Sequence, residues 1–566
     1  MSWAVLAPRL IARGLGRCWP WRCGASARQS VCARSSAGCV SLLDTTKQDE
    51  LFSAACLYRC RAVKSVLRVS ARTPLILLGI ALAIALQILN ARGLLSAYSY
   101  WSDEAFSAAT ALADWKSLFF SWVLPDTAPP LFPVFLKTWQ SIFGYSEISS
   151  RLLSFAFSTA ALIVLSLFAL RSGRAAYICA VLFLGTSPIF SRYGQEVRNY
   201  SLVLLLSAVA LSGLIEWCRH VRAGQSSVRS EACFRVSIIF LSLTHYFALV
   251  YCFALLSFKA FYGFLAASRR NSELLRDAVN AILIVAFPVW HLVAFRRQSS
   301  VNLLAWNDVR PFWGTLSNLG ESLWPGNAIA PLVIVLLLLV ALFAAPVFSS
   351  SIKAQLVVIA ASSCIFVSLI IIIDLITASF STDRNFIVIL PAATLAISCL
   401  LQGMVESIKQ LVPRLLILSL ALFAAIQQFN VSASNMLHGK IVPYENYKQV
   451  AVSLGRSGVC KKVSCYSIGV GKWWSDVYFG PQSVSLIDLP AVHSAPADPG
   501  SIIVAAGPAG RAGLTRERER EGVGLEGSQC LQPRQAWNRS VLVLVPERLV
   551  SDLIKYKLSN VDCPSV

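Results

Sequence analysis

Long apolar blocks dominate this chain of 566 residues and limit what it can fold into. A helix needs about 20 apolar residues to cross a bilayer core about 30 Å thick. Eleven such blocks begin near Pro74, Leu152, Ala175, Asn199, Cys233, Leu249, Ala278, Ala328, Ala354, Asn385 and Leu415. Charged residues make up only 14% of the chain and hydrophobic ones 56%, which excludes an ordinary soluble domain and a disordered chain. The pattern predicts a mainly α, polytopic helical membrane protein with about 11 transmembrane helices.

The basic residues indicate how the chain is oriented. The formal net charge is +21, but the Lys and Arg residues mostly stand in short runs between apolar blocks, as in cytoplasmic loops, and not in a nucleic-acid-binding surface. With the N-terminus in the cytoplasm, each predicted inner loop is basic, and the outer loops carry acids such as Asp103, Glu104 and Asp126. An odd number of spans then places residues 430–566 outside.

Three regions follow from this division. We interpret residues 1–72 as a basic N-terminal tail, either disordered or the result of a start codon assigned too far upstream, with a transit peptide as the alternative. Residues 73–429 form the transmembrane domain, whose first outer loop, 97–150, is rich in aromatic residues and is expected to hold interfacial helices, including an amphipathic helix over Pro130–Gly144.

The third region, residues 430–566, is predicted to be a small extracytoplasmic α/β domain. A helical stretch at Tyr447–Leu454 precedes β-rich runs at Lys462–Val470, Ser501–Ala506 and Ser540–Pro546, and Thr515–Gly527 is expected to be a mobile loop. Cys460 and Cys465 are candidates for a disulfide if their compartment is oxidising.

Two acidic sites in the first outer loop are candidates for chemistry. Asp103 and Glu104 follow the first span directly, where they could serve as a general base and as a metal or hydrogen-bond partner; the alternative is a pair of solvated loop acids. Asp126 precedes Thr-Ala-Pro-Pro, so that a rigid turn would hold its carboxylate, or it caps a helix.

Arginines on the outer side run against the usual charge bias and are candidates for binding a lipid phosphate. Arg192, Arg198 and Tyr200 lie where the fourth span opens, and Arg384 precedes the tenth. The alternatives are an i,i+4 pair of Arg192 with Glu196 and, for Arg384, neutralisation by Asp383. His245 ends the fifth span, where a structural role competes with a binding role.

These motifs, taken in order, resemble membrane glycosyltransferases of the GT-C class, in particular the protein O-mannosyltransferase-like and aminoarabinose transferase-like families grouped as glycosyltransferase family 39. The resemblance covers about residues 74–460. It rests on the segments Tyr100–Ala105, Asp126–Phe132, Phe143–Glu147, Arg151–Ser154, Gln195–Tyr200, Thr244–Phe247, Arg384–Pro391 and Tyr444–Ala451. Bacterial members commonly have His-Pro-Pro where this chain has Ala128-Pro129-Pro130, so any substrate contact of that histidine is lost.

The resemblance implies an inverting hexosyl- or pentosyltransferase that moves a sugar from a polyprenyl-phosphate donor to an acceptor hydroxyl on the non-cytoplasmic face. It implies Asp103 as general base, Glu104 as its modulator or as a partner at a divalent metal, and Asp126 as a second site acid. Arg192, Arg198 and Arg384 would compensate phosphate charge, with Tyr200 and His245 nearby. The acceptor would be a lipid, a glycan or a protein, and no cofactor beyond a possible metal is implied.

Two other functions compete with sugar transfer. A lipid or sugar transporter or flippase would carry paired charges inside its spans, and Asp374 is the main charge that the sequence places there. A non-catalytic scaffold subunit is the second alternative. We expect the bacterial inner membrane as the location, with the endoplasmic reticulum membrane as the alternative.

Overall fold

The computed structural model describes residues 74–91, 99–124, 129–265, 275–284, 312–323, 348–377, 381–437, 446–468, 474, 477–478, 486–489, 501–506, 528–533 and 541–561, with single gaps at 75, 226, 409 and 557. Most of these residues lie in helices, so the chain is mainly α, as predicted. The block near Ala328, Asp126 and the loop Thr515–Gly527 fall outside the described residues.

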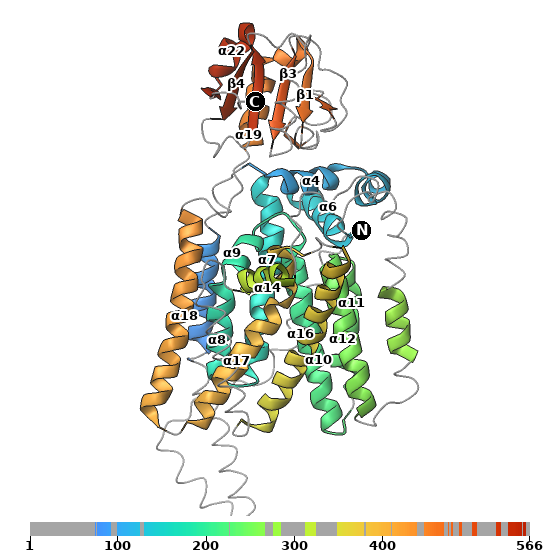
Figure 1. The fold of residues 1–566 in the computed structure, drawn as a ribbon, viewed down its shortest axis with the longest axis vertical. Helices are drawn as coiled ribbons and strands as arrows, with labels where there is room; N and C mark the ends of the chain where they lie inside the picture. Colours follow the sequence, from blue (N-terminus) through green and yellow to red (C-terminus); the bar gives the residue numbers. More distant parts are fainter. Residues whose placement is uncertain are drawn as a thin grey trace, which may run out of the picture. The chain divides into compact units, whose positions relative to one another are not determined.

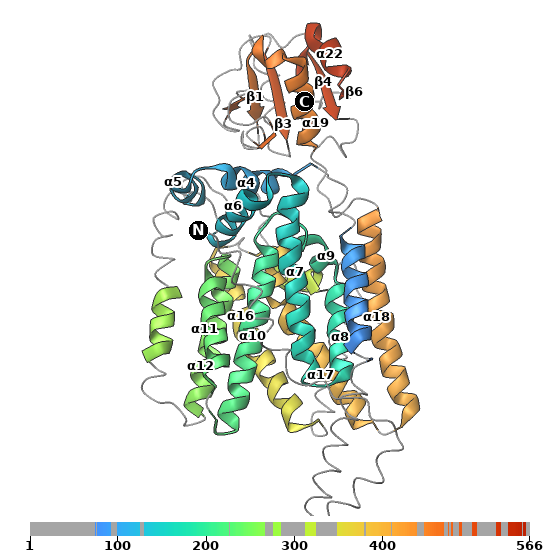
Figure 2. The same cartoon turned by 180° about the vertical axis from the view of Figure 1, so that it is seen from behind.

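Ten of the eleven apolar blocks coincide with a described helix. The first of them is Ile76–Asn90, and another lies at residues 275–284. The others are α7 (Glu147–Leu170), α8 (Arg174–Gly185), α10 (Tyr200–Arg222), α11 (Val228–Ser242), α12 (Tyr246–Leu265), α16 (Ser350–Thr377), α17 (Leu390–Ser407) and α18 (Leu411–Leu437). Six helices of the described part are long and apolar enough to cross a membrane. Figures 1 and 2 show these helices running side by side.

The surface of this bundle is apolar where it faces outward. Leu77, Leu78, Ile84 and Ile88 on the first helix are exposed, and α16 and α18 expose further large aliphatic side chains. A water-soluble protein rarely leaves so much apolar surface uncovered. The exposed faces therefore suit contact with lipid tails, and the protein is a multi-pass membrane protein.

Close helix packing inside the bundle depends on small residues. Gly213 of α10 lies against the backbone of Phe234 in α11, and a β-carbon at position 213 would come within 3.0 Å of the Phe234 amide nitrogen. Such an approach lets the two backbones touch, as small residues do in membrane helices. This packing fixes α10, whose first residues belong to the candidate site.

Short helices lie across one end of the bundle, as expected for the first outer loop (Figure 1). They are α4 (Ser102–Leu112), α5 (Trp115–Ser117), the π-helical turn Leu118–Val123 and α6 (Leu131–Phe143). The helix α6 matches the predicted amphipathic helix: it begins after Pro130 and ends at Gly144, whose φ of 82° favours glycine. Further short helices are α9 (Pro188–Tyr193), α14 (Phe312–Leu323) and the 3-10 helix η5 (Asp383–Ile389).

The C-terminal region is an α/β domain, as predicted. It contains α19 (Tyr447–Ser457), the turn Val459–Lys461 and α22 (Glu547–Ile554). Its six strands are β1 (Cys465–Ile468), β2 (Leu486–Leu489), β3 (Ile502–Ala506), β4 (Ser528–Pro533), β5 (Val541–Pro546) and β6 (Leu558–Val561), in the sheet order β2-β1-β3-β5-β4-β6. The strand β1 pairs in parallel with β2 and β3, and the other pairs are antiparallel. The two candidate cysteines, Cys460 and Cys465, form a disulfide, and Cys530 is also disulfide-bonded.

This domain contacts the loop 97–150 and the first turn of α7 through polar groups. The Tyr478 hydroxyl accepts a hydrogen bond from the Tyr100 amide at 2.8 Å, and the Lys448 amide donates to the Ser99 hydroxyl at 3.1 Å. The Lys448 ammonium also pairs with Glu147 at 2.9 Å. The C-terminal domain therefore fixes the segment that precedes Asp103.

Candidate functional site

The first turn of α4 carries the two candidate acids. Trp101 is extended, with φ −87° and ψ 174°, and its amide donates to Glu104 Oε2 at 3.4 Å, so the Glu104 side chain caps the helix start. Acidic side chains in a first helical turn are also favoured by the helix dipole. The local sequence thus fixes Asp103 and Glu104 at a defined helix N-terminus.

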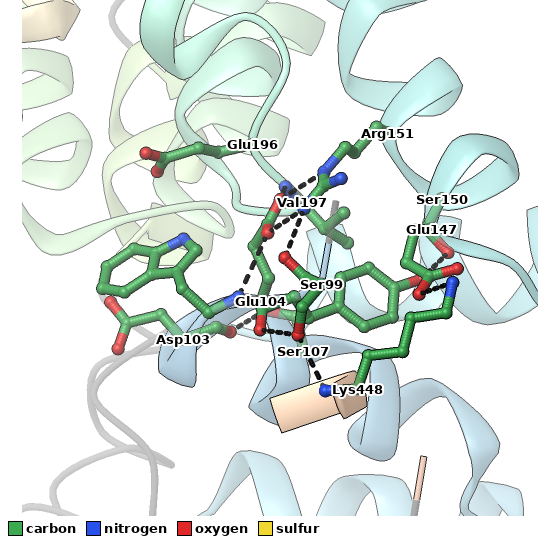
Figure 3. Close-up of polar contacts among 12 residues, drawn as sticks. Ser99, Asp103, Glu104, Ser107, Glu147, Ser150, Arg151, Glu196, Val197 and Lys448 are labelled. Carbon is green, nitrogen blue, oxygen red and sulfur yellow. Dashed lines mark hydrogen bonds and ion pairs between the residues drawn. The ribbon is translucent and has the colours of Figure 1, made fainter. Parts of the chain in front are cut away.

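Glu104 is buried and fully engaged. Arg151 of α7 donates to Glu104 through Nη2 at 2.6 Å and Nε at 3.0 Å, a two-pronged contact, and the Val197 amide donates to Glu104 Oε1 at 3.0 Å. Both side chains of the ion pair are almost inaccessible to solvent, at 6% for Arg151 and 2% for Glu104. Glu104 therefore joins α4, α7 and the loop before α10 into one unit, as Figure 3 shows.

Asp103 points away from this unit and meets two other arginines. Its Oδ2 lies 3.4 Å from Arg384 Nη1 and 3.8 Å from Arg198 Nη2, and its side chain is 30% exposed. In Figure 3 the Asp103 carboxylate lies apart from Glu104 and on the side toward Glu196. Two adjacent acids thus face two different environments, one closed and one open to a ligand.

Different elements bring the two arginines to Asp103. Arg198 lies in the loop between α9 and α10, and its amide donates to the Glu196 carbonyl at 2.7 Å. Arg384 lies in η5, 281 residues from Asp103 along the chain. Both guanidinium groups are largely buried, with exposed fractions of 15% and 21%. Cations held in such a poorly solvated place attract an anion strongly.

Glu196 is a third acid beside this centre. It is buried and pairs with Arg192 Nε at 3.4 Å in the predicted i,i+4 arrangement. Burial raises the pKa of Glu196 to about 7, opposed by Arg192 and reinforced by the charge of Glu104. Glu196 therefore changes charge near neutral pH. Arg192 keeps 40% of its side chain exposed.

His245 and Tyr200 line the same region. Their rings lie 5.9 Å apart, and His245 Nδ1 accepts a hydrogen bond from the Phe247 amide at 3.1 Å. Burial lowers the pKa of His245 to about 3, and Arg198 and Arg384 lower it further. The imidazole is therefore neutral at pH 7, with Nε2 as its donor atom.

The structure brings together most of the residues singled out in the sequence. Asp103, Arg198 and Arg384 converge, while Arg192 pairs with Glu196 beside them, and Tyr200 and His245 adjoin each other. Asp126 lies outside the described residues. In the described part of the chain, no group of three His, Cys, Asp or Glu side chains that could hold a metal ion occurs.

Sequence reasoning missed the role of Arg151 and of the Val197 amide. Arg151 lies 47 residues after Glu104, inside the first turns of an apolar helix. A cation at that position is unusual and was the available signal, because charges inside a spanning helix are expected to have a nearby partner. No sequence pattern marks a backbone amide such as that of Val197.

No protein-family model and no curated protein sequence matches this chain. Solved structures that are similar in fold include the following two. One is the crystal structure of ArnT from Cupriavidus metallidurans in the apo state, with 13% identity, a TM-score of 0.49, and coverage of 84% of this chain and 98% of that chain. The other is ArnT from Cupriavidus metallidurans bound to undecaprenyl phosphate, with 13% identity, a TM-score of 0.47, and coverage of 83% and 98%.

Proposed function

We propose that this protein is a GT-C-like membrane glycosyltransferase that moves a sugar from a polyprenyl-phosphate donor to an acceptor hydroxyl. The observation that carries the proposal is the position of Asp103, a partly exposed carboxylate within 3.8 Å of two largely buried guanidinium groups. A polyprenyl phosphate combines an apolar tail with an anionic head. Exposed apolar helices beside paired arginines provide complementary surfaces for both parts.

The chemistry assigned to Asp103 is that of a general base. Its carboxylate takes the proton of the acceptor hydroxyl, and the acceptor oxygen forms a bond to the anomeric carbon. The bond from that carbon to the phosphate oxygen breaks at the same time, and the bonding electrons leave with the carrier phosphate. Attack opposite the leaving group inverts the anomeric configuration, and Arg198 and Arg384 stabilise the charge that develops on the phosphate.

A bound phosphate would change the contacts of Asp103. Asp103 shares the two arginines in the structure, and a bound phosphate would compete for the same guanidinium groups. Their contacts to Asp103 would weaken, which leaves its carboxylate oxygens able to accept a hydrogen bond from the acceptor hydroxyl. Donor binding would thus prepare the base. Glu104 remains a positioning residue, because Arg151 and Val197 occupy its oxygens.

The proposal includes an orientation. The disulfide Cys460–Cys465 belongs to the same half of the molecule as Ser99 and Tyr100, through the contacts of Lys448 and Tyr478. Disulfides persist in oxidising compartments. We therefore place the C-terminal domain and Asp103 on the non-cytoplasmic face and the N-terminus in the cytoplasm, with a bacterial inner membrane as the expected location.

The test is sugar transfer by purified protein with a panel of radiolabelled polyprenyl-phosphate sugars. Asp103→Asn is expected to lower transfer at least a hundredfold while the protein still binds undecaprenyl phosphate. Asp114→Asn is the matched control, because Asp114 is an exposed acid of the same loop that pairs with Ser117. Full activity in Asp103→Asn would remove this carboxylate from the mechanism.

A further inference from the structure

A second site lies at the other end of the bundle. A cavity of about 590 Å³ opens between α10, α12 and α16, lined by the last turns of α10 and the first turns of α16. Tyr200 begins α10 beside Asp103, and Arg222 ends it. At 1.5 Å per residue these ends are about 30 Å apart, so the cavity belongs to the opposite leaflet and is separate from the candidate active site.

The polar part of the cavity is strongly basic. Its lining includes Arg219, Arg222 and Lys353, and the described residues of the lining include no carboxylate. Arg222 donates from Nη1 to the Ser350 carbonyl at 3.0 Å, so its guanidinium is directed to the start of α16. The hydroxyls of Ser350 and Ser351 and the positive end of the α16 dipole add further groups suited to an anion.

Charge compensation within the protein is partial. Glu216 accepts from Arg219 at 2.9 Å and also pairs with Arg171 at 3.0 Å. Among the described residues this carboxylate serves two arginines, while Arg222 donates to the Ser350 carbonyl and adds a further positive charge to the lining. The cavity therefore favours an anionic occupant.

The rest of the lining is apolar and continues onto the lipid-facing surface. This part consists of Ile215, Tyr262, Val357 and Val358. The Val357 side chain of α16 is 58% exposed. A small soluble anion would leave these side chains uncovered. An amphiphile with an anionic head and acyl chains would cover both parts.

We propose that this cavity binds the phosphate headgroup of an anionic glycerophospholipid from the leaflet opposite the candidate active site. Arg219, Arg222 and Lys353 contact the phosphate, with the hydroxyls of the first α16 turn as additional donors. The acyl chains lie along α16. Basic pockets between membrane helices on the cytoplasmic side bind anionic lipid heads by this chemistry.

The experiment measures lipid binding to the purified full-length protein by native mass spectrometry and by the lipid-dependent rise in the apparent Tm. The probes are phosphatidylglycerol, phosphatidylcholine with the same acyl chains, and glycerol phosphate without chains. Phosphatidylglycerol is expected to bind at least tenfold more tightly than the other two. Equal binding of phosphatidylcholine, or equal binding of glycerol phosphate, would overturn the proposal of an anionic lipid site.

Substitutions inside and outside the lining distinguish a specific binding site from general attraction to a positively charged surface. Arg222→Ala with Lys353→Ala is expected to weaken phosphatidylglycerol binding at least tenfold. Arg229→Ala is the matched control, because Arg229 is an exposed cation at the start of the neighbouring α11 outside the lining. Equal losses in the two cases would show diffuse attraction to the basic surface and overturn the proposal.

A steric variant covers the case in which the charge variant does not fold. Ala354→Phe fills the cavity from α16 and keeps all three cations. Loss of phosphatidylglycerol binding in a protein with an unchanged elution profile would support the site. Unchanged binding would overturn it. Neither outcome depends on sugar transfer, so this proposal stands or fails independently of the proposed enzyme activity.

Discussion

Glu104 Oε1 accepts a hydrogen bond from the backbone amide of Val197 at 3.0 Å, and this contact ties the start of α4 to the loop before α10. The next residue on each side of the contact belongs to the candidate site: Asp103 precedes Glu104, and Arg198 follows Val197. The contact therefore helps to set the distance between Asp103 and Arg198. Glu104 is expected to matter for geometry and stability, and Asp103 for chemistry.

Removing the Glu104 carboxylate should destabilise the fold. Glu104→Ala leaves the buried Arg151 guanidinium without its carboxylate, and breaking a buried pair in this way costs about 3–5 kcal/mol. The double variant Glu104→Met with Arg151→Met removes both charges and is expected to recover most of the lost stability. Thermal unfolding of the two proteins in the same detergent measures the difference.

A second readout of the double variant separates positioning from stability. Val197 loses its acceptor when Glu104 is replaced by Met, so binding of undecaprenyl phosphate should stay weak even after the Tm recovers. Recovery of both the Tm and the binding would mean that Glu104 acts only as half of an ion pair.

Arg198 and Arg384 should determine affinity for a polyprenyl phosphate. A charge-assisted hydrogen bond is worth about 1.5–3 kcal/mol, so Arg198→Ala or Arg384→Ala should weaken undecaprenyl phosphate binding by about 10- to 150-fold. Lysine at either position keeps the charge but not the forked geometry and should restore only part of the affinity. Equilibrium binding at two salt concentrations provides the measurement.

Substitutions of two other arginines serve as controls for this loss of affinity. Arg192 is partly exposed and pairs with Glu196, so Arg192→Ala should lose less affinity than Arg198→Ala. Arg456→Ala, an exposed cation of α19, should bind like the unchanged protein. Equal losses at all four positions would indicate nonspecific attraction and no phosphate site.

The sequence was informative where one physical rule determines the structure. Helix existence followed from apolar length, so blocks such as those at Leu152 and Asn199 coincide with α7 and α10. The convergence of Asp103 with Arg198 and Arg384 could be expected from their common side of the membrane. The contacts of Arg151 could not be expected in this way. Arg151 and Glu104 are 47 residues apart, and their contact depends on which helices pack side by side.

The C-terminal domain shows a second limit. The β-rich runs at Ser501–Ala506 and Ser540–Pro546 predicted β3 and β5, which are apolar and buried. The strand β2 (Leu486–Leu489) was missed, and so were the more polar strands β4 (Ser528–Pro533) and β6 (Leu558–Val561). The sequences of β4 and β6 contain Gln, Pro, Ser and Asn, and it is pairing with a neighbouring strand that makes them strands, since strand formation depends strongly on context.

Glu196 should make stability depend on pH near neutrality. Its pKa is about 7 in the folded protein against an ordinary value of 4.5, so the fold favours the protonated form. This stabilisation is complete below pH 4.5 and is lost as the pH rises through 7, with a total on the order of 3 kcal/mol. Glu196→Gln cannot ionise. The stability of this variant relative to the unchanged protein should therefore be higher at pH 8.5 than at pH 5.5.

Apparent Tm values at these two pH values test this expectation. Glu547→Gln, at an exposed position of α22, is the control and should show the same pH profile as the unchanged protein. A Glu196→Gln profile parallel to that of the unchanged protein would show that this carboxyl does not titrate in the window.

Accessibility of the disulfide should report which face carries the candidate site. Cys460 and Cys465 are bonded to each other, and Cys530 of the same domain is also disulfide-bonded. A membrane-impermeant phosphine added to right-side-out vesicles should therefore expose thiols, those of Cys460 and Cys465 among them, that an impermeant maleimide then labels. A Gln225→Cys variant provides the inner reporter, because residue 225 lies exposed between α10 and α11 at the end remote from Asp103. It should be labelled only after the vesicles are opened. The reverse pattern would place Asp103 in the cytoplasm, where a donor presented on the outer face could not reach it.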